Sequence, residues 1–243
     1  MTLHGLLHCR RCWADEGVAT QEQGPFRLVR DPGHWGAVDP QILVLGLSKG
    51  NTQSGAVGFE CFESIAFKGM RDRLLNILQS VGLLPEESIA KFDQRFLQKE
   101  QDYAFASMVR CSLTAMHAKK GIHTADSPNV VPAFRSGSAG FEYVKNCATQ
   151  FLLPLTQRTK LVLLLGNSDP YISAILDLID QVRGGIRAVS PIAFDSDSVR
   201  FVHLAHPSRA NGHFGKFIRG EGTPGKKRDL AAAAIHSLLW AEN

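Results

Sequence analysis

The chain has 243 residues, a formal net charge of +4 and an ordinary globular composition, with 44% hydrophobic and 21% charged residues. That composition excludes a wholly disordered protein. No apolar run approaches the length of a membrane span, and the N-terminus lacks the long apolar core of a secretory signal. We therefore expect a cytoplasmic, monomeric protein with no membrane contact, forming a single domain over residues 1–243 in which a cysteine-bearing segment, residues 1–40, packs on the core.

Positive charge gathers near the C-terminal end. Between Arg200 and Arg228 the chain carries seven Lys or Arg residues against the single acid Glu221, a net of +6 that leaves −2 for the remainder. A basic segment of this kind suits a polyanion such as nucleic acid. A solvated basic loop accounts for the charge equally well, so charge alone leaves both interpretations open.

The first clear strand follows a loop-like N-terminal segment. Residues 1–40 carry turn signals, and residues 41–47 form a continuous apolar run, the pattern of a strand buried on both faces of a parallel sheet. The polar, glycine-rich residues 48–55 lack the Gly-Lys-Ser/Thr order of a phosphate-binding loop. Apolar residues at helical spacing then predict a helix over residues 70–81, with Gly82 as its C-terminal cap.

Further strands and helices alternate along the rest of the chain. The expected elements are a charged helical surface element at 85–101, a strand at 104–109, a long loop at 117–140, a helix at 141–156, a strand at 160–166, a helix at 169–183, a strand at 199–205 and a closing helix at 227–240. This alternation predicts an α/β fold, a three-layer α/β/α sandwich around a central four-stranded, mostly parallel sheet.

The cysteines point to a metal site more than to disulfides. Their number is five, and an odd count in a cytosolic-looking chain argues against a disulfide framework. Cys9 and Cys12 form a CxxC motif, whose spacing lets two thiolates reach one metal centre, either zinc or iron–sulfur. No strand precedes the motif, which disfavours a thioredoxin-like redox role. Two further cysteines are needed to close such a site.

The sequence His206-Pro207-Ser208 ends the strand expected at 199–205. Proline disfavours helix at the residue before it, so His206 is expected to be extended at a strand end. In a parallel α/β sheet, ligands bind beyond the strand ends, where a histidine can donate to a developing negative charge. Taken alone, the motif also fits an ordinary turn with a solvated histidine.

The order of these motifs resembles one known superfamily. A CxxC precedes a strand ending in Gly-Leu, a Phe-x-Gly helix start, a strand ending in Val-Arg-Cys, a later cysteine, a strand ending in Leu-Gly and a strand ending in His-Pro-Ser. The chain thereby resembles the uracil-DNA glycosylase superfamily over roughly residues 9–235, in particular its iron–sulfur branches, the fourth and fifth families, and it is closer to the fifth. The resemblance implies a uracil-DNA glycosylase-like fold and excision of damaged bases that are flipped out of DNA.

The resemblance also assigns a base pocket. The first motif of the superfamily falls on residues 46–50, Phe67 matches the aromatic residue that stacks on the flipped base, and Ser107 matches the residue that reads the base edge. The residues expected to bind the base are Gly46, Leu47, Ser48, Gly50, Phe67 and Ser107. Phe67 is equally well explained as core packing at a helix start. Serine offers one hydroxyl where the fourth family has an asparagine, so a broader base specificity than uracil alone is expected.

The catalytic and DNA-binding residues follow from the same comparison. His206 would stabilise negative charge on the departing base, and Asn51 and Gln53 would position water. The fourth family has a glutamate where Leu47 stands, and the usual proline is replaced by Lys49, so the motif does not name the residue that activates water. The residues expected to contact DNA are Ser208, Arg209, Asn211, Lys216 and Arg219, with an affinity that falls as salt rises.

The resemblance implies a 4Fe–4S cluster held by Cys9, Cys12, Cys111 and Cys147, which supply the four thiolates that such a cluster needs. A structural zinc at the same cysteines stays open. The gap between the last two is longer than usual, which an insertion at 117–140 explains. Cys61 is left over as a buried or idle thiol.

The expected function is therefore that of a DNA-repair glycosylase, which hydrolyses the N-glycosidic bond of uracil or of another deaminated or damaged base. Two alternatives stay open. In the first, the protein is a catalytically silent relative that binds DNA or a damaged base. In the second, it is a nucleoside or nucleotide hydrolase on the same scaffold. An iron–sulfur electron carrier is disfavoured, because nothing in the sequence suggests a redox partner.

Overall fold

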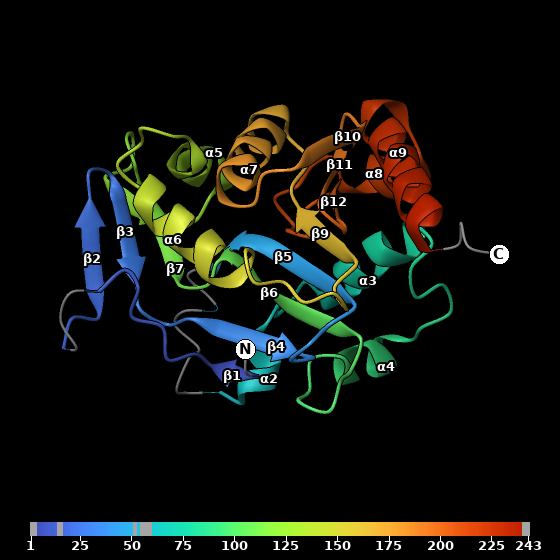
Figure 1. The fold of residues 1–243 in the computed structure, drawn as a ribbon, viewed down its shortest axis with the longest axis horizontal. Coiled ribbons are helices and arrows are strands. Elements are labelled where there is room, and N and C mark those ends of the chain that lie inside the picture. The colour runs from blue at the N-terminus through green and yellow to red at the C-terminus, as the bar shows by residue number, and fades with distance from the viewer. Residues whose placement is uncertain (1–3, 14–16, 51–52, 54–59, 240–243) are drawn as a thin grey trace.

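The computed structural model describes residues 4–13, 17–50, 53 and 60–239. A large sheet runs through the middle of the molecule (Figure 1). The four apolar runs that predicted strands form its centre, paired in parallel in the order β6-β5-β9-β12. These strands are β5 (Ile42–Ser48), β6 (Tyr103–Val109), β9 (Leu161–Leu165) and β12 (Val199–Leu204).

Over the described residues the sheet has eight strands, so it is wider than the predicted four-stranded sheet, which corresponds to its parallel centre. Antiparallel strands extend it on both sides, with β4 and β1 beyond β6 and with β11 and β10 beyond β12. These short strands use the backbone groups that the parallel strands leave unpaired at the edges, and they lack the long apolar run that marks a central strand. The four outer strands are β1 (Gly5–Leu6), β4 (Gly33–Gly36), β10 (Ile186–Ser190) and β11 (Ala193–Ser196).

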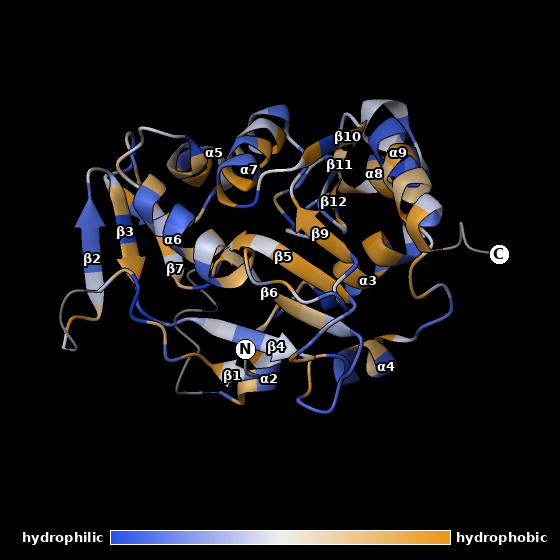
Figure 2. Cartoon of the chain, viewed as in Figure 1, coloured by the Kyte–Doolittle hydropathy of each residue, from blue (hydrophilic) through white to orange (hydrophobic). Residues whose placement is uncertain are grey.

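A second, antiparallel sheet lies beside the first, in the order β2-β3-β7-β8. It corrects the prediction of loops at 1–40 and 117–140, and the hydrophilic colour of β2 in Figure 2 shows why its sequence gave no strand signal. The elements concerned are β2 (Thr20–Gln23), β3 (Phe26–Val29), β7 (Ser112–His117), β8 (Ile122–Thr124), α5 (Ser127–Val130) and a 3₁₀ turn (Val131–Phe134).

Helices cover both faces of the large sheet, as predicted for three layers. Successive side chains of a strand point to opposite faces, and β5 follows this rule. Leu43 and Leu45 share a core cluster with α6 and α7, whereas Ile42 and Val44 share a second cluster with α3 and α9. The helices are α2 (Phe62–Ile65), α3 (Arg71–Ser80), α4 (Ile89–Gln94), α6 (Phe141–Phe151), α7 (Asp169–Val182), α8 (Phe214–Arg219) and α9 (Gly222–Leu239).

Two of the expected helices are shorter than their sequence patterns suggested. The charged stretch 85–101 is helical only over α4, and the helix at 141–156 ends at Phe151. Within the part of the chain that the structure describes, no helix is long and apolar enough to span a bilayer.

A buried ion pair fastens the loop after β5. The side chain of Lys49 is 1% exposed, and its ammonium lies 3.0 Å from the Asp31 carboxylate. The same carboxylate accepts hydrogen bonds of 2.8 Å from the backbone N–H and from the hydroxyl of Ser112, at the start of β7. The pair therefore ties the end of a central strand to the second sheet.

Replacing Lys49 with methionine is expected to lower the free energy of unfolding by about 3–5 kcal/mol, because it leaves the Asp31 carboxylate buried without its counter-ion. Urea denaturation measures the loss. Lys68→Met is the matched control, since Lys68 pairs with Glu60 at 2.6 Å on the exposed surface and such pairs contribute only about 0–1 kcal/mol. Equal losses in the two variants would contradict a stabilising role for the buried pair.

Among the described residues, three histidines make the fold sensitive to acid. Burial lowers the pKa of His34 to about 3 and those of His203 and His206 to about 4. The unfolded chain has the higher histidine pKa, near 6.5. It therefore binds more protons as the pH falls, and the stability that is complete above pH 6.5 is lost below it.

Between about pH 6.5 and pH 5, we expect each of these histidines to remove about 1.4 kcal/mol of unfolding free energy per pH unit. Urea denaturation at a series of pH values measures the slope, and His203→Asn is expected to reduce it by about a third, because His34 and His206 still contribute. A stability that is flat over this interval would contradict the neutral, buried state of these side chains.

Candidate active site

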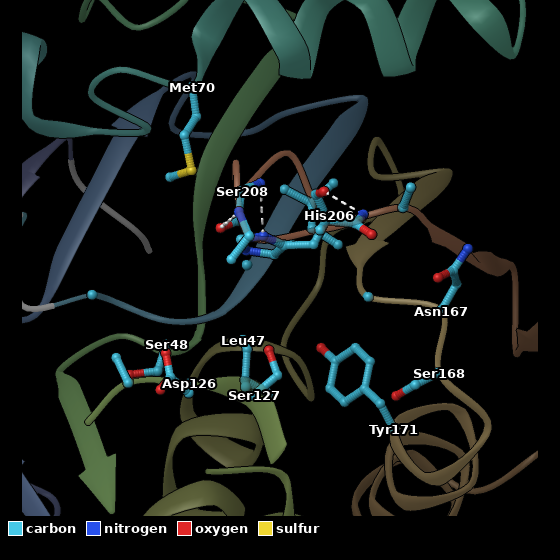
Figure 3. A pocket seen from close by; sticks show the side chains of 18 of the residues that line it. Leu47, Ser48, Met70, Asp126, Ser127, Asn167, Ser168, Tyr171, His206 and Ser208 are labelled. Atoms are coloured by element: carbon cyan, nitrogen blue, oxygen red, sulfur yellow. Dashed lines mark hydrogen bonds between the residues drawn. The ribbon is translucent and has the colours of Figure 1, made fainter. Parts of the chain in front are cut away.

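A cavity of about 1610 Å³ opens at the carboxyl ends of the parallel strands. Loops after β5, β9 and β12 form its walls, together with the turn before α3 and the segment that joins β8 to α5. Ligands bind in this position in open α/β sheets. Figure 3 shows side chains from these separate segments facing one another across the space.

His206 lines the cavity directly after β12. Its Nδ1 atom lies 3.1 Å from the backbone nitrogen of Ser208. That N–H donates, so Nδ1 accepts and the imidazole proton is carried by Nε2. Burial lowers the pKa of His206 to about 4, so at neutral pH the side chain is an uncharged hydrogen-bond donor with a fixed tautomer.

The turn that carries His206 is held from two sides. Arg73 of α3 donates to the carbonyl oxygens of Pro207 at 2.6 Å and Ser208 at 3.0 Å, and its guanidinium lies 3.6 Å from the ring centre of Phe214. Asn211 donates from its side-chain amide to the His206 carbonyl at 2.8 Å. Arg73 was missed in the sequence because 134 residues separate it from Pro207.

Three of the residues assigned to the base pocket line one recess of the cavity. Gly46 and Ser107 are paired in register on β5 and β6. A Cβ atom built on Gly46 would lie 3.7 Å from the Ser107 hydroxyl oxygen and 4.0 Å from the Phe67 ring. Phe67 is 6% exposed and has a φ of 53°. A bulky side chain is rare in this conformation, and such strain is concentrated at functional sites.

The loop after β5 contributes the other residues expected there. Leu47, Ser48 and Gly50 line the cavity, as does Gln53. The Ser48 hydroxyl accepts from the backbone N–H of Leu113 at 2.8 Å and lies 3.0 Å from its carbonyl oxygen. Ser48 is therefore tied to β7. The prediction that Asn51 positions water falls outside the described residues.

Asp126 is a cavity residue that the sequence reading missed. Figure 3 shows it, together with Ser48 and Ser127, among the side chains that line the cavity. Across the described residues its carboxylate has no ion pair and no hydrogen bond. The other carboxylate that lines the cavity belongs to Asp169, which pairs with Lys227 at 2.7 Å. The order Asp126-Ser127-Pro128 is a helix-start pattern, which could have marked this segment as ordered.

Tyr171 was also missed. It lies in the first turn of α7 and lines the cavity, with 2% of its surface exposed. Its hydroxyl is buried and finds no hydrogen-bond partner in the described structure. Its ring meets Phe134 and His203 edge-on, with ring centres 6.0 and 5.4 Å away. In Figure 3 the hydroxyl points into the cavity.

The residues expected to contact DNA fall into two groups. Ser208, Arg209 and Asn211 line the cavity. Lys216 and Arg219 are exposed on α8, outside the cavity wall, and Arg219 pairs with Glu221 at 2.7 Å. The amide oxygen of Asn211 accepts from the backbone of His213 at 3.0 Å, so this side chain is engaged at both ends within its own turn.

The four cysteines assigned to a metal site come from distant segments but share one neighbourhood. Cys147 on α6 lies close enough to Cys9 and Cys12 for negative charge on those thiols to raise its pKa, and Cys147 acts on the pKa of Cys111 in the same way. As the described side chains stand, no three His, Cys, Asp or Glu residues are arranged to hold a metal ion. Cys61 is exposed and contacts Glu63.

Arg110, the residue before Cys111, is fully buried beside Cys147, and two of its guanidinium nitrogens, Nε and Nη1, find no partner in the part of the chain that the structure describes. Burial lowers its pKa to about 10, so it remains a cation at neutral pH. A buried charge without a counter-ion is costly. The surroundings of these cysteines therefore favour a bound group of negative charge.

Comparisons with known proteins add little to this picture. No family model matches the chain, and no curated protein matches it. Among solved structures, it is similar to the wild-type SMUG2 of Pedobacter heparinus, with 14% identity, coverage of 82% of this chain and 76% of that one, and a TM-score of 0.42. A likeness this distant carries no conclusion about function, which rests on the site.

Proposed function

We propose that the protein is a DNA glycosylase that hydrolyses the N-glycosidic bond of a deaminated or damaged base flipped into the cavity. The observation that carries this proposal is the state of His206, an uncharged donor with a fixed tautomer in the wall of the same cavity as the recess of Gly46, Phe67 and Ser107. The flat apolar ring of Phe67 and the hydroxyl of Ser107 together suit a base that is planar and polar at its edge.

The role of His206 follows from the electrons of the reaction. As the bond between C1′ and the base nitrogen breaks, its electron pair leaves with the base and the sugar gains oxocarbenium character. The Nε2–H of His206 would donate to a base oxygen as negative charge develops there. A donor that is held in place before the reaction needs no reorganisation when the charge appears.

Asp126 is the group best suited to activate water. Its carboxylate lies in the cavity wall and pairs with no cation among the described residues, whereas that of Asp169 is neutralised by Lys227. In the second half of the reaction, a water oxygen bonds to C1′ and the water proton passes to the Asp126 carboxylate. The base departs as an anion that His206 stabilises, and Asp126 returns its proton to solvent.

The recess predicts a tolerant base specificity. Ser107 supplies one hydroxyl, which can donate or accept, and the ring of Phe67 supplies a stacking face for any base. Neither feature selects uracil strictly. Arg209 at the cavity wall and the exposed Lys216 would contact phosphates, which makes binding of DNA weaken as salt rises.

A 4Fe–4S cluster, or a zinc ion, at Cys9, Cys12, Cys111 and Cys147 belongs to the same proposal. The donor set supplies four thiolates. The buried cation of Arg110, whose Nε and Nη1 have no hydrogen-bond partner among the described residues, complements the negative charge that four thiolates bring. Such a group would fasten the N-terminal segment to α6 and to the junction of β6 and β7. We assign it this structural role, and no step of the chemistry passes through it.

Protein purified without oxygen or chelators is expected to contain either about four iron and four sulfide per chain or about one zinc. Elemental analysis and the visible absorption spectrum distinguish the two. Cys147→Ser is expected to lose the metal, while Cys61→Ser, at the cysteine in contact with Glu63, retains it. Wild-type protein that folds and binds no metal would contradict this assignment.

The test of the function is a strand-cleavage assay on labelled oligonucleotides that carry uracil, hypoxanthine, xanthine or an etheno base, with alkali added to cut at abasic sites. We expect cleavage at one or more of these bases, and a rate that falls steeply with salt. Binding to a damaged oligonucleotide without release of the base would favour a silent relative. Hydrolysis of free nucleosides that is insensitive to moderate salt would favour a nucleoside hydrolase.

A further inference from the structure

We propose that the hydroxyl of Tyr171 forms a hydrogen bond with a polar atom of the flipped base, and so helps to select which bases the cavity accepts. This inference rests on the proposed glycosylase function and extends it to a specific contact. Tyr171 lines the cavity, and its hydroxyl is buried without a hydrogen-bond partner in the described structure. Figure 3 shows it directed into the space that a ligand would fill.

The missing partner is the first reason to expect a ligand there. More than nine in ten buried polar groups in folded proteins have a hydrogen-bond partner, because an unpaired one is costly. Ser127, Asn167 and Ser168 line the cavity near this ring in Figure 3, yet none of them has a hydrogen bond with the hydroxyl. A group outside the described chain, either a water molecule or a ligand that displaces it, is therefore needed to satisfy Tyr171.

The second reason is that the Tyr171 ring is held rigidly. It packs edge-on against Phe134 and His203. The backbone at Gly166 passes so close that a Cβ atom there would lie 2.6 Å from Cδ1 of the ring. The hydroxyl therefore cannot turn away to find another partner, and its position before binding is the position that the ligand meets.

The chemistry of the hydroxyl defines what it selects. Burial raises the pKa of Tyr171, so the group is a neutral phenol that donates one hydrogen bond and also accepts. A carbonyl oxygen, ring nitrogen or amino group of a base satisfies it, whereas a methyl group or an apolar ring edge leaves it unpaired. A site built around a polar contact rejects ligands that lack the matching group.

The experiment compares Tyr171→Phe with Tyr143→Phe. Both residues are tyrosines with a buried hydroxyl that lacks a partner, but Tyr143 lies on α6 and outside the cavity wall. Each variant removes one oxygen and keeps the ring. Without DNA, both are expected to melt at the wild-type temperature or slightly above it, because an unsatisfied polar group has been removed.

With DNA, the two variants are expected to differ. Tyr171→Phe should weaken equilibrium binding of an oligonucleotide that carries the preferred base by about 3–10-fold. The difference in affinity between this oligonucleotide and those with poorer bases should become smaller. Tyr143→Phe should bind as the wild type does. Equal affinities for the two variants, with an active wild type, would overturn the role of Tyr171 alone. A wild type that neither binds nor processes any damaged oligonucleotide would instead overturn the proposed function, and this inference with it.

Discussion

His206→Ala is expected to slow base release by about 10²–10³-fold under single-turnover conditions. In the proposed mechanism the side chain donates to charge that exists only as the bond breaks, so the loss should appear in the rate of the chemical step and hardly in the affinity for DNA. Single-turnover kinetics with saturating enzyme measure the first quantity, and equilibrium binding measures the second. Circular dichroism and metal content confirm that the variant is folded.

The matched control is His123→Ala. His123 lies on β8, outside the cavity wall, 3.9 Å from Glu22. Its replacement is expected to leave the rate within about twofold, as is usual for substitutions away from a site. A His206→Ala enzyme that matches this control would contradict the assignment of His206 to catalysis.

The pH dependence of base release distinguishes a neutral His206 imidazole from a charged imidazolium as the donor. Because the pKa of His206 is about 4, the side chain is neutral throughout the range from pH 8 to pH 5. If the donor is neutral, the factor by which His206→Ala slows base release is expected to stay constant over that range. A charged imidazolium with an ordinary histidine pKa would instead make the wild-type rate rise as the pH falls through about 6.5, and that result would contradict the neutral donor.

Asp126→Asn is expected to lower the single-turnover rate by about 10²–10⁴-fold, the usual contribution of a general base. The amide keeps the size of the carboxylate but does not take up the proton of the attacking water. Asp126→Ala offers a second measurement, because added formate can supply the missing carboxylate. Partial recovery of the rate with formate is expected for Asp126→Ala and not for the wild type.

Asp169→Asn is the control for this prediction. Its carboxylate lines the same cavity but is already bound to Lys227 on the exposed surface, where an ion pair contributes about 0–1 kcal/mol. We expect it to stay within about threefold of the wild-type rate. If Asp169→Asn abolished base release while Asp126→Asn did not, the water-activating role would have been assigned to the wrong carboxylate.

The centre of the fold was predictable because its signals are local. The strands β5, β6, β9 and β12 are apolar runs of the kind that parallel sheets require, and the structure places all of them side by side in parallel. The outer strands gave no such signal. β2, with the sequence Thr-Gln-Glu-Gln, is exposed over most of its length and exists because β3 offers it backbone hydrogen bonds. Such pairing depends on tertiary structure.

The candidate site also contains residues that the sequence marked and residues that only the structure revealed. Gly46, Phe67, Ser107 and His206 line one cavity, and their roles in base binding and catalysis stay predictions. The sequence could not single out Asp126 and Tyr171, because both were identified by polar side chains that the folded chain leaves without a partner in the cavity wall. Arg73 acts through a contact across 134 residues. The binding of DNA and of a metal by the residues named here stays a prediction.

The most direct test of the central claim is to detect a free base by mass spectrometry after wild-type protein is incubated with a duplex that contains a single damaged or deaminated base. We expect free base and an abasic strand in equal amounts, both formed about 10²–10³-fold more slowly with His206→Ala. If folded protein with its metal content verified released no base from any duplex or single strand in the panel, the glycosylase assignment would be contradicted.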